Sequence, residues 1–224
     1  MGKKDLIKQK REQKKKQDLW VILIISIIAV AIIAVIVISK LPKSIKTVDV
    51  SAKPMENALN LGDPNAPVKV IEFADFQCPY CGLYWKQLEP TIISTYVATN
   101  KVYYTYSPMA FIGQESIDAV EASYCANDQN KFWEYRDYLF SNQTGENAGD
   151  FSQAHLIAFA KKLNLDVNTF TSCLTSGQYA TKVNDDNTYA SQQGVNSTPS
   201  FLVNGTVYNS SNVEQAIADA VAGK

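Results

Sequence analysis

Hydrophobic and polar positions along this chain predict a long apolar segment followed by a mixed α/β domain. Residues 19–39 contain no charged side chain. A helix rises about 1.5 Å per residue, so a segment of this length matches the hydrocarbon thickness of a membrane, about 30 Å. We interpret it as a transmembrane anchor. It is too long for a signal-peptide core, and no small-x-small cleavage pattern follows it.

The residues after the predicted anchor divide into a linker and a domain. Residues 40–61 are polar, contain prolines and show no sustained period, which predicts an extracytoplasmic linker. Apolar runs at 68–73 and 102–106 then predict strands, with a helix between them that starts at Pro79 and bends near Pro90. Alternating strand and helix signals of this kind favour an α/β sheet.

The second half of the domain is predicted to be largely helical. Apolar positions recur at helical spacing over 114–179 with little β signal, and a further helix is expected over 180–193. An apolar strand at 201–203 comes next, and an amphipathic helix at 213–221 closes the domain.

Composition and charge agree with one packed domain and an attached membrane segment. The 224 residues are 46% hydrophobic and 11% aromatic, which is ample for a core. The net charge of −1 conceals an asymmetry, because residues 1–18 hold eight basic and three acidic side chains. By the positive-inside rule this basic tail is expected to be cytoplasmic, with the domain outside the cytoplasm. No aromatic residues interleave with the basic ones, so nucleic-acid binding is not expected.

The most informative chemistry lies in Cys78-Pro79-Tyr80-Cys81, where an apolar run gives way to a helical pattern. Two cysteines at this spacing can close a disulfide, and the free N–H groups of a helix start stabilise the first sulfur as a thiolate. The motif predicts a redox-active dithiol, with Cys78 as the attacking thiolate and Cys81 as the less exposed resolving thiol. Pro79 suits the first helical turn. Zinc and copper sites use the same spacing, so the motif alone leaves metal binding open.

A second feature is Thr198-Pro199, directly before the predicted strand at 201–203. A proline opening a strand is permitted only where its missing N–H is not needed. Three separated segments carry a family likeness: GDPNAPVKVIEFADFQCPYCG, DQNKFWEYRDYLF and GVNSTPSFLVNG. With these in this order, residues 62–222 resemble the DsbA-like branch of the thioredoxin superfamily, the thiol-disulfide oxidoreductases of bacterial envelopes.

The resemblance implies a thioredoxin-like fold over residues 62–224, with an inserted helical subdomain at about 113–179. It implies that Pro199 is cis and faces the dithiol, and that Thr198 offers its backbone to an extended substrate peptide. It also implies a buried acid at Glu72, where a carboxyl of raised pKa could exchange a proton with a thiol. The alternative for Glu72 is a plain surface carboxylate, because so short a run does not fix which way the strand faces.

The resulting functional hypothesis is a membrane-tethered enzyme that forms disulfides in exported proteins. The resemblance implies re-oxidation by an integral-membrane oxidase of the DsbB or VKOR type, and no cofactor beyond the redox-active disulfide. Tyr80 stands where strongly oxidising members carry histidine, so a milder oxidant is expected. The alternatives are an envelope reductase or isomerase, and a metal-binding chaperone that uses the same cysteines. The absence of Met or His residues clustered beside Cys78 disfavours the chaperone.

Four further residues are candidates for structural or proton-transfer roles. Cys125 and Cys173 are expected to form a structural disulfide, since the compartment permits one; free buried thiols and a second redox relay are the alternatives. His155, the single histidine, is interpreted as a solvated or packed side chain rather than a ligand. Asp75 is expected in the turn before the motif, as a weaker candidate than Glu72 for proton transfer. No metal site is predicted.

Overall fold

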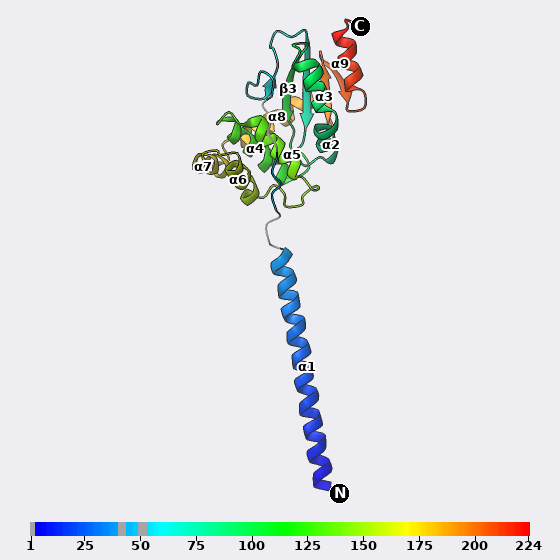
Figure 1. The fold of residues 1–224 in the computed structure, drawn as a ribbon, viewed down its shortest axis with the longest axis vertical. Coiled ribbons are helices and arrows are strands. Elements are labelled where there is room, and N and C mark those ends of the chain that lie inside the picture. Colours follow the sequence, from blue (N-terminus) through cyan, green and yellow to red (C-terminus); the bar gives the residue numbers. More distant parts are fainter. Residues whose placement is uncertain (1–2, 40–43, 49–52) are drawn as a thin grey trace. The chain divides into compact units, whose positions relative to one another are not determined.

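The computed structural model of this chain describes residues 3–39, 44–48 and 53–224, and forms two compact units, Met1–Lys43 and Ser44–Lys224. In the first unit it describes the helix α1 (Lys3–Ser39; Figure 1). Within α1, the stretch Lys14–Ala34 has a mean hydropathy of 2.5 and is long and apolar enough to cross a membrane. It overlaps the segment 19–39 that the sequence predicts as an anchor.

The second unit is built on a five-stranded sheet of order β1-β3-β2-β4-β5 among the described residues. At its centre β2 (Val68–Ala74) runs parallel to β3 (Val102–Pro108) and antiparallel to β4 (Ser200–Val203). The short strands β1 (Asn60–Leu61) and β5 (Thr206–Asn209) add antiparallel edges. Neither edge strand was predicted, because β1 is only two residues long and β5 lacks a buried face.

The helix expected to start at Pro79 and bend near Pro90 consists of three pieces. These are α2 (Pro79–Gln87), α3 (Glu89–Ile92) and the π-helical turn η1 (Ile93–Val97). Pro90 lies in the first turn of α3. A proline has no N–H to donate to the preceding turn, so the helix is interrupted just before it.

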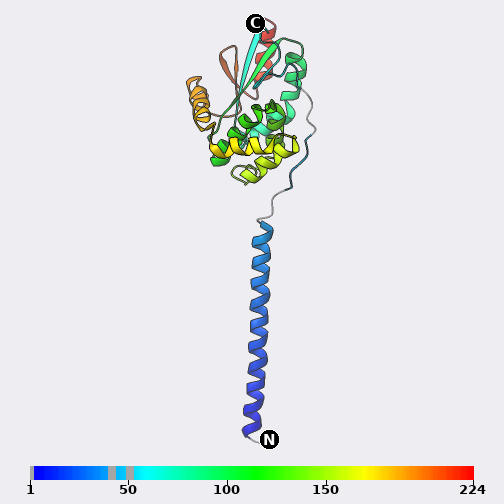
Figure 2. The same ribbon diagram turned by 90° about the vertical axis from the view of Figure 1, so that its left-hand side faces the viewer.

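Helices cover both faces of the sheet. Successive side chains of a strand point to opposite faces. Val70 of β2 accordingly packs in the main core, whereas Phe73 packs against Ala190 of α8 (Ala180–Gln192). Figure 2 shows the sheet between α8 on one side and α2 and α3 on the other. The last helix, α9 (Val213–Val221), packs against β2 and β4.

The predicted helical insertion is a group of four helices between β3 and α8 (Figure 1). They are α4 (Gln114–Asn127), α5 (Phe132–Asn142), α6 (Gln153–Lys162) and α7 (Val167–Ser176). The large side chains of α5 are almost entirely buried, so this helix links the insertion to the sheet domain. The predicted α/β architecture with a helical insertion is therefore confirmed.

The segment predicted as a linker is partly packed against the second unit. The backbone N–H of Lys46 donates to Oδ1 of Asn142 (2.7 Å), and the Lys53 ammonium lies 2.9 Å from Asp137 Oδ2. Two apolar side chains of the segment also pack against the core: Ile45 and Val48. Part of the predicted linker thus belongs to the compact unit that begins at Ser44. The pattern could not show this, because the partners are supplied by α5, far along the chain.

Candidate functional site

The cysteine motif lies where β2 has ended and α2 begins. Cys78 is the N-cap residue of α2, and its carbonyl accepts hydrogen bonds from the backbone N–H groups of Cys81 and Gly82 (3.1 and 3.2 Å). Pro79 occupies the first helical position, where its missing N–H has no intrahelical partner to lose. Cys78 is 6% exposed and Cys81 is fully buried one turn further on, whereas Tyr80 is 70% exposed. Cys78 is therefore the sulfur nearer to solvent.

The two thiols differ in their electrostatic environment. A hydrogen bond from the Cys81 thiol lowers the pKa of Cys78 to about 6; burial opposes this, and the backbone N–H groups of Cys81 and Tyr80 add to it. Burial raises the pKa of Cys81 well above its ordinary value, and the adjacent Cys78 sulfur raises it further. At neutral pH Cys78 is thus mainly a thiolate and Cys81 a thiol. Attacking and resolving cysteines need this protonation pattern.

The Thr198-Pro199 peptide lies directly beside the motif and is cis. It precedes β4, whose antiparallel pairing with β2 places Ser200 opposite Phe73. Since β2 leads into the motif, this pairing brings two segments 120 residues apart into contact. The Sγ atom of Cys78 lies 3.4 Å from the backbone carbonyl oxygen of Thr198.

Glu72 lies on β2 with its side chain fully buried, so it is not a surface carboxylate. Its Oε2 atom accepts hydrogen bonds from the Tyr104 hydroxyl (2.8 Å) and from Nη2 of Arg136 (3.2 Å). Arg136 also forms a buried ion pair with Glu89 of α3. Burial raises the pKa of Glu72 to about 7, although Arg136 and the Tyr104 hydrogen bond work against the rise. Within the described residues, the side-chain hydrogen bonds of Glu72 come from these two side chains.

Arg136 was not among the residues singled out from the sequence. Its guanidinium is fully buried on α5, 4.7 Å from the ring centre of Tyr106 and 5.0 Å from that of Trp133. The helical period carried a usable signal, because Arg136 lies on the same stripe as the buried side chains of Trp133 and Phe140. A cation in a buried stripe needs anionic partners, and here they are Glu72 and Glu89.

Asp75, predicted as a turn residue, is fully buried and anchors the turn that leads into the motif. Its carboxylate accepts hydrogen bonds from the backbone N–H groups of Gln77 (2.8 Å) and Phe111 (3.0 Å) and from Oγ of Ser116 (2.7 Å). Its backbone carbonyl accepts the N–H of Cys78 (3.0 Å). Burial raises the pKa of Asp75, and the hydrogen bonds partly offset the rise.

The other predicted residues lie in the helical insertion. Cys125 of α4 and Cys173 of α7 form a disulfide. His155 is buried, with Nδ1 3.1 Å from the backbone carbonyl oxygen of Asp150, and its ring packs against Phe159; it is a packed side chain. In the part of the chain that the structure describes, no three His, Cys, Asp or Glu side chains are grouped so that they could hold a metal ion.

Comparison with known sequences gives a consistent assignment. Residues 55–221 match the model of a family described as Thioredoxin. The probable disulfide bond formation protein D of Bacillus cereus is 32% identical over 155 residues, covering 67% of this chain and 71% of that protein. The Na(+)/H(+) antiporter NhaA 1 of Salinispora arenicola is 33% identical over 168 residues, covering 72% of this chain. Those residues are 24% of the antiporter, so the chain spans about a quarter of that relative's length.

Solved structures share the fold. Oxidised BdbD from Bacillus subtilis has a TM-score of 0.68 and 24% identity, covering 77% of this chain and 98% of that one. Oxidised Mtb DsbA has a TM-score of 0.59 and 26% identity, covering 74% of this chain and 93% of the other. The sheet domain with its helical insertion is therefore a thioredoxin-like fold of the kind seen in DsbA proteins.

Proposed function

Because this chain belongs to the thioredoxin family, we propose that it is a thiol-disulfide oxidoreductase that forms disulfides in exported proteins through Cys78 and Cys81. One observation carries the proposal above all. The Cys78 sulfur has a pKa lowered to about 6 and lies 3.4 Å from the backbone carbonyl oxygen of Thr198, with the buried Cys81 behind it. A stabilised thiolate next to an available backbone segment suits disulfide exchange with a bound peptide.

The proposed reaction starts from the Cys78–Cys81 disulfide. A substrate thiolate attacks Sγ of Cys78, the bond to Cys81 breaks, and Cys81 leaves as a thiolate that takes up a proton. A second substrate thiolate then attacks the substrate sulfur of the mixed disulfide, and Cys78 leaves as a thiolate. Two electrons pass from the substrate to the enzyme. The lowered pKa of Cys78 makes it a good leaving group, and the raised pKa of Cys81 accounts for its need of a proton.

Three further residues receive proposed roles. Glu72 is assigned as the proton donor to Cys81, because its pKa of about 7 lets it both hold and release a proton near neutral pH. Its Oε1 atom is buried and has no hydrogen-bond partner among the described residues, so that oxygen is available to pass a proton through an intervening water. Cis-Pro199 and Thr198 would hold the substrate as an extended strand against the dithiol.

We also propose that α1 anchors the protein in the membrane, with residues 1–18 in the cytoplasm and the second unit outside. The apolar stretch Lys14–Ala34 of α1 supports this, since its side chains Trp20 and Ile22 are 69% and 65% exposed. A bilayer would cover such a surface. A re-oxidising partner of the DsbB or VKOR type in the same membrane would restore the disulfide.

The proposal is tested by trapping. The Cys81→Ala variant should accumulate mixed disulfides with substrate proteins, whereas Cys78→Ala should not; equal trapping by both would contradict these roles. The reduction potential, measured against glutathione, should lie at about −120 to −230 mV, since Tyr80 supplies no imidazolium. A value near that of thioredoxin, about −270 mV, would favour the reductase alternative. Stoichiometric copper or zinc binding by the dithiol without trapping would favour the metal chaperone.

A further inference from the structure

A side chain of the helical insertion reaches the base of the cysteine motif. The amide Nε2 of Gln143 donates hydrogen bonds to the backbone carbonyl oxygens of Phe76 (2.6 Å) and Cys78 (3.0 Å). One amide nitrogen carries two N–H donors, so both are used here. The two carbonyls belong to the turn and the N-cap residue that set the direction of α2. Gln143 thereby connects the insertion to the backbone that carries the reactive sulfur.

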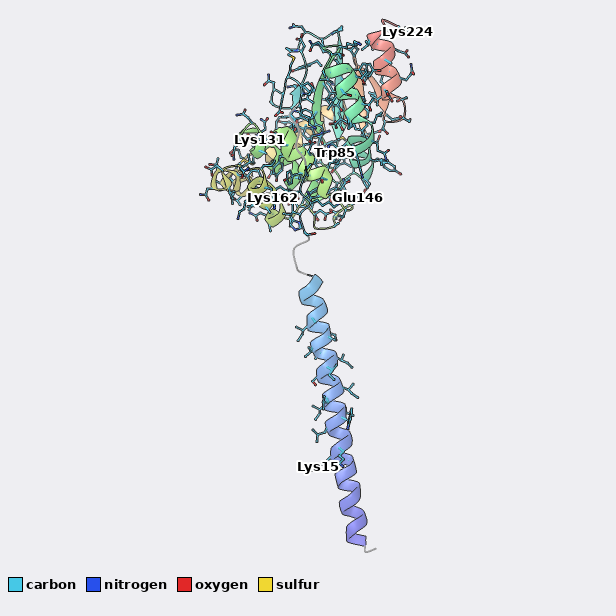
Figure 3. All side chains as sticks on the ribbon, viewed as in Figure 1. Lys15, Trp85, Lys131, Glu146, Lys162 and Lys224 are labelled. Atoms are coloured by element: carbon cyan, nitrogen blue, oxygen red, sulfur yellow. A yellow bond between two sulfur atoms is a disulfide. The ribbon has the colours of Figure 1, made fainter. Side chains whose placement is uncertain are left out.

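The end of α5 fixes the position of Gln143. Gln143 is the C-cap residue of α5, and its backbone N–H donates to the carbonyl of Leu139 (3.1 Å) while its own backbone is extended. The same helix makes a second polar contact with α2, where Nε1 of Trp85 (labelled in Figure 3) donates to Oδ1 of Asp137 (2.8 Å). Because α5 is buried, its C-terminal side chain is held at a defined distance from the motif.

The residue after the motif is fitted to this contact. Gly82 follows Cys81 in α2, and a methyl group added there would lie 2.6 Å from Oε1 of Gln143. Carbon and oxygen cannot approach that closely, so the amide would have to move away from Phe76 and Cys78. Glycine destabilises a helix relative to alanine, and its presence here leaves room for the amide of Gln143.

We propose that Gln143 is a positioning residue that keeps Cys78 in its thiolate form, an inference that rests on the proposed function. Its two donors hold the turn that places the N–H groups of Tyr80 and Cys81, which lower the pKa of Cys78, near the sulfur. They also reduce the negative potential of the two carbonyl oxygens near it. Both effects favour the charged form of Cys78 over the neutral thiol. Loss of the amide donors should therefore make the protein a weaker oxidant, even though Gln143 touches neither sulfur nor substrate.

The test uses the full-length reduced protein in detergent and two readouts. The pH midpoint of Cys78 alkylation by iodoacetamide needs no redox partner, and the equilibrium with glutathione measures oxidising strength. The variant Gln143→Met keeps the side-chain length but has no donors. A hydrogen bond contributes about 0.5–1.5 kcal/mol, which corresponds to about a 2- to 10-fold change. We expect the alkylation midpoint to rise by about 0.3–1 pH unit, and the constant for oxidation of glutathione to fall by the same factor.

Gly82→Ala disturbs the same contact from α2, because the added methyl group displaces the Gln143 amide. It provides a second test if Gln143→Met does not fold. It should shift both readouts in the same direction, and in a Gln143→Ala background it should add nothing. Thermal stability should show the matching pattern: Gly82→Ala should raise the melting temperature in the Gln143→Ala background but not in the wild type, because only there is alanine free of the clash. Gln192→Met, at an exposed position of α8, is the matched control.

Two results would overturn the proposal. One is an alkylation midpoint in Gln143→Met equal to those of the wild type and Gln192→Met. The other is full additivity of Gly82→Ala and Gln143→Ala in that midpoint. Failure of the proposed function would look different, because a wild-type protein that does not exchange disulfides with glutathione would still give a Cys78 alkylation midpoint.

Discussion

Ionisation of Cys78 should make the stability of the reduced protein depend on pH in a way that serine at this position abolishes. Folding lowers the pKa of Cys78 from 9.0 to about 6, chiefly through the hydrogen bond from Cys81. Since the folded-state value lies below the unfolded one, the stabilisation is fully present above about pH 9 and is lost as the pH falls through about 6.

The size of the effect follows from the two pKa values. Linkage between 9.0 and about 6 gives about 1.4 kcal/mol at pH 7 and about 3.7 kcal/mol at pH 9. The sulfur keeps some contact with solvent, and screening reduces these figures. We therefore expect about 1 kcal/mol at pH 7, about 3 kcal/mol at pH 9 and close to zero at pH 5.

The assay compares the free energies of unfolding of the reduced wild type and of Cys78→Ser. Both full-length proteins are unfolded with urea in detergent at pH 5, 7 and 9, with tryptophan fluorescence as the probe. The other titrating groups are common to both proteins and cancel in the difference, apart from the part of the Cys81 pKa shift that the Cys78 sulfur causes. The change from thiol to hydroxyl adds a constant to the difference in unfolding free energy. The dependence of that difference on pH is therefore the quantity that tests the prediction.

A difference in unfolding free energy that stays constant within about 0.5 kcal/mol from pH 5 to pH 9 would refute the reasoning. Cys81→Ala provides a second measurement. It removes the hydrogen bond that contributes most to the low pKa of Cys78, so the pH window of the stabilisation should move upward in this background.

Three further predictions concern the rest of the molecule. Arg136→Met leaves the carboxylates of Glu72 and Glu89 buried without their cation and should lower the free energy of unfolding by about 3–5 kcal/mol at pH 8; urea titrations should show a smaller loss at pH 5, because Glu72, with a pKa of about 7, is then protonated. Replacing both Cys125 and Cys173 by alanine removes a disulfide between residues 48 apart in the sequence. Because the disulfide restricts the unfolded chain, its loss should lower the unfolding free energy by about 4 kcal/mol, and a loss below about 1 kcal/mol would contradict this argument. Protease added outside spheroplasts should separate the second unit from a membrane-bound fragment containing residues 19–39, whereas protection of that unit, or a soluble form starting after residue 39 in untreated cells, would contradict the anchor.

Features whose causes lie within a few residues of sequence could be predicted from the sequence. The uncharged run at 19–39 predicted a helix long and apolar enough to cross a membrane, and α1 contains such a stretch, because this property depends only on local length and composition. The position of Cys78 at a helix start followed from the end of an apolar run and from Pro79. Regular apolar spacing predicted the helical insertion without any knowledge of its partners.

The tertiary structure alone decided which side chains meet. The strand pattern alone allowed Glu72 to be either a surface or a buried carboxylate. In the structure it is buried, and Arg136 of α5, 64 residues further along the chain, donates a hydrogen bond to it. Asp75 and Gln143 form hydrogen bonds with backbone groups of the motif and of the turn before it. Contacts with backbone groups produce no pattern in the sequence. A helical or strand period tells which residues share a face, but the free energy of burying a charge or an amide depends on the groups packed against that face. Those groups come from segments that only the folded chain brings together.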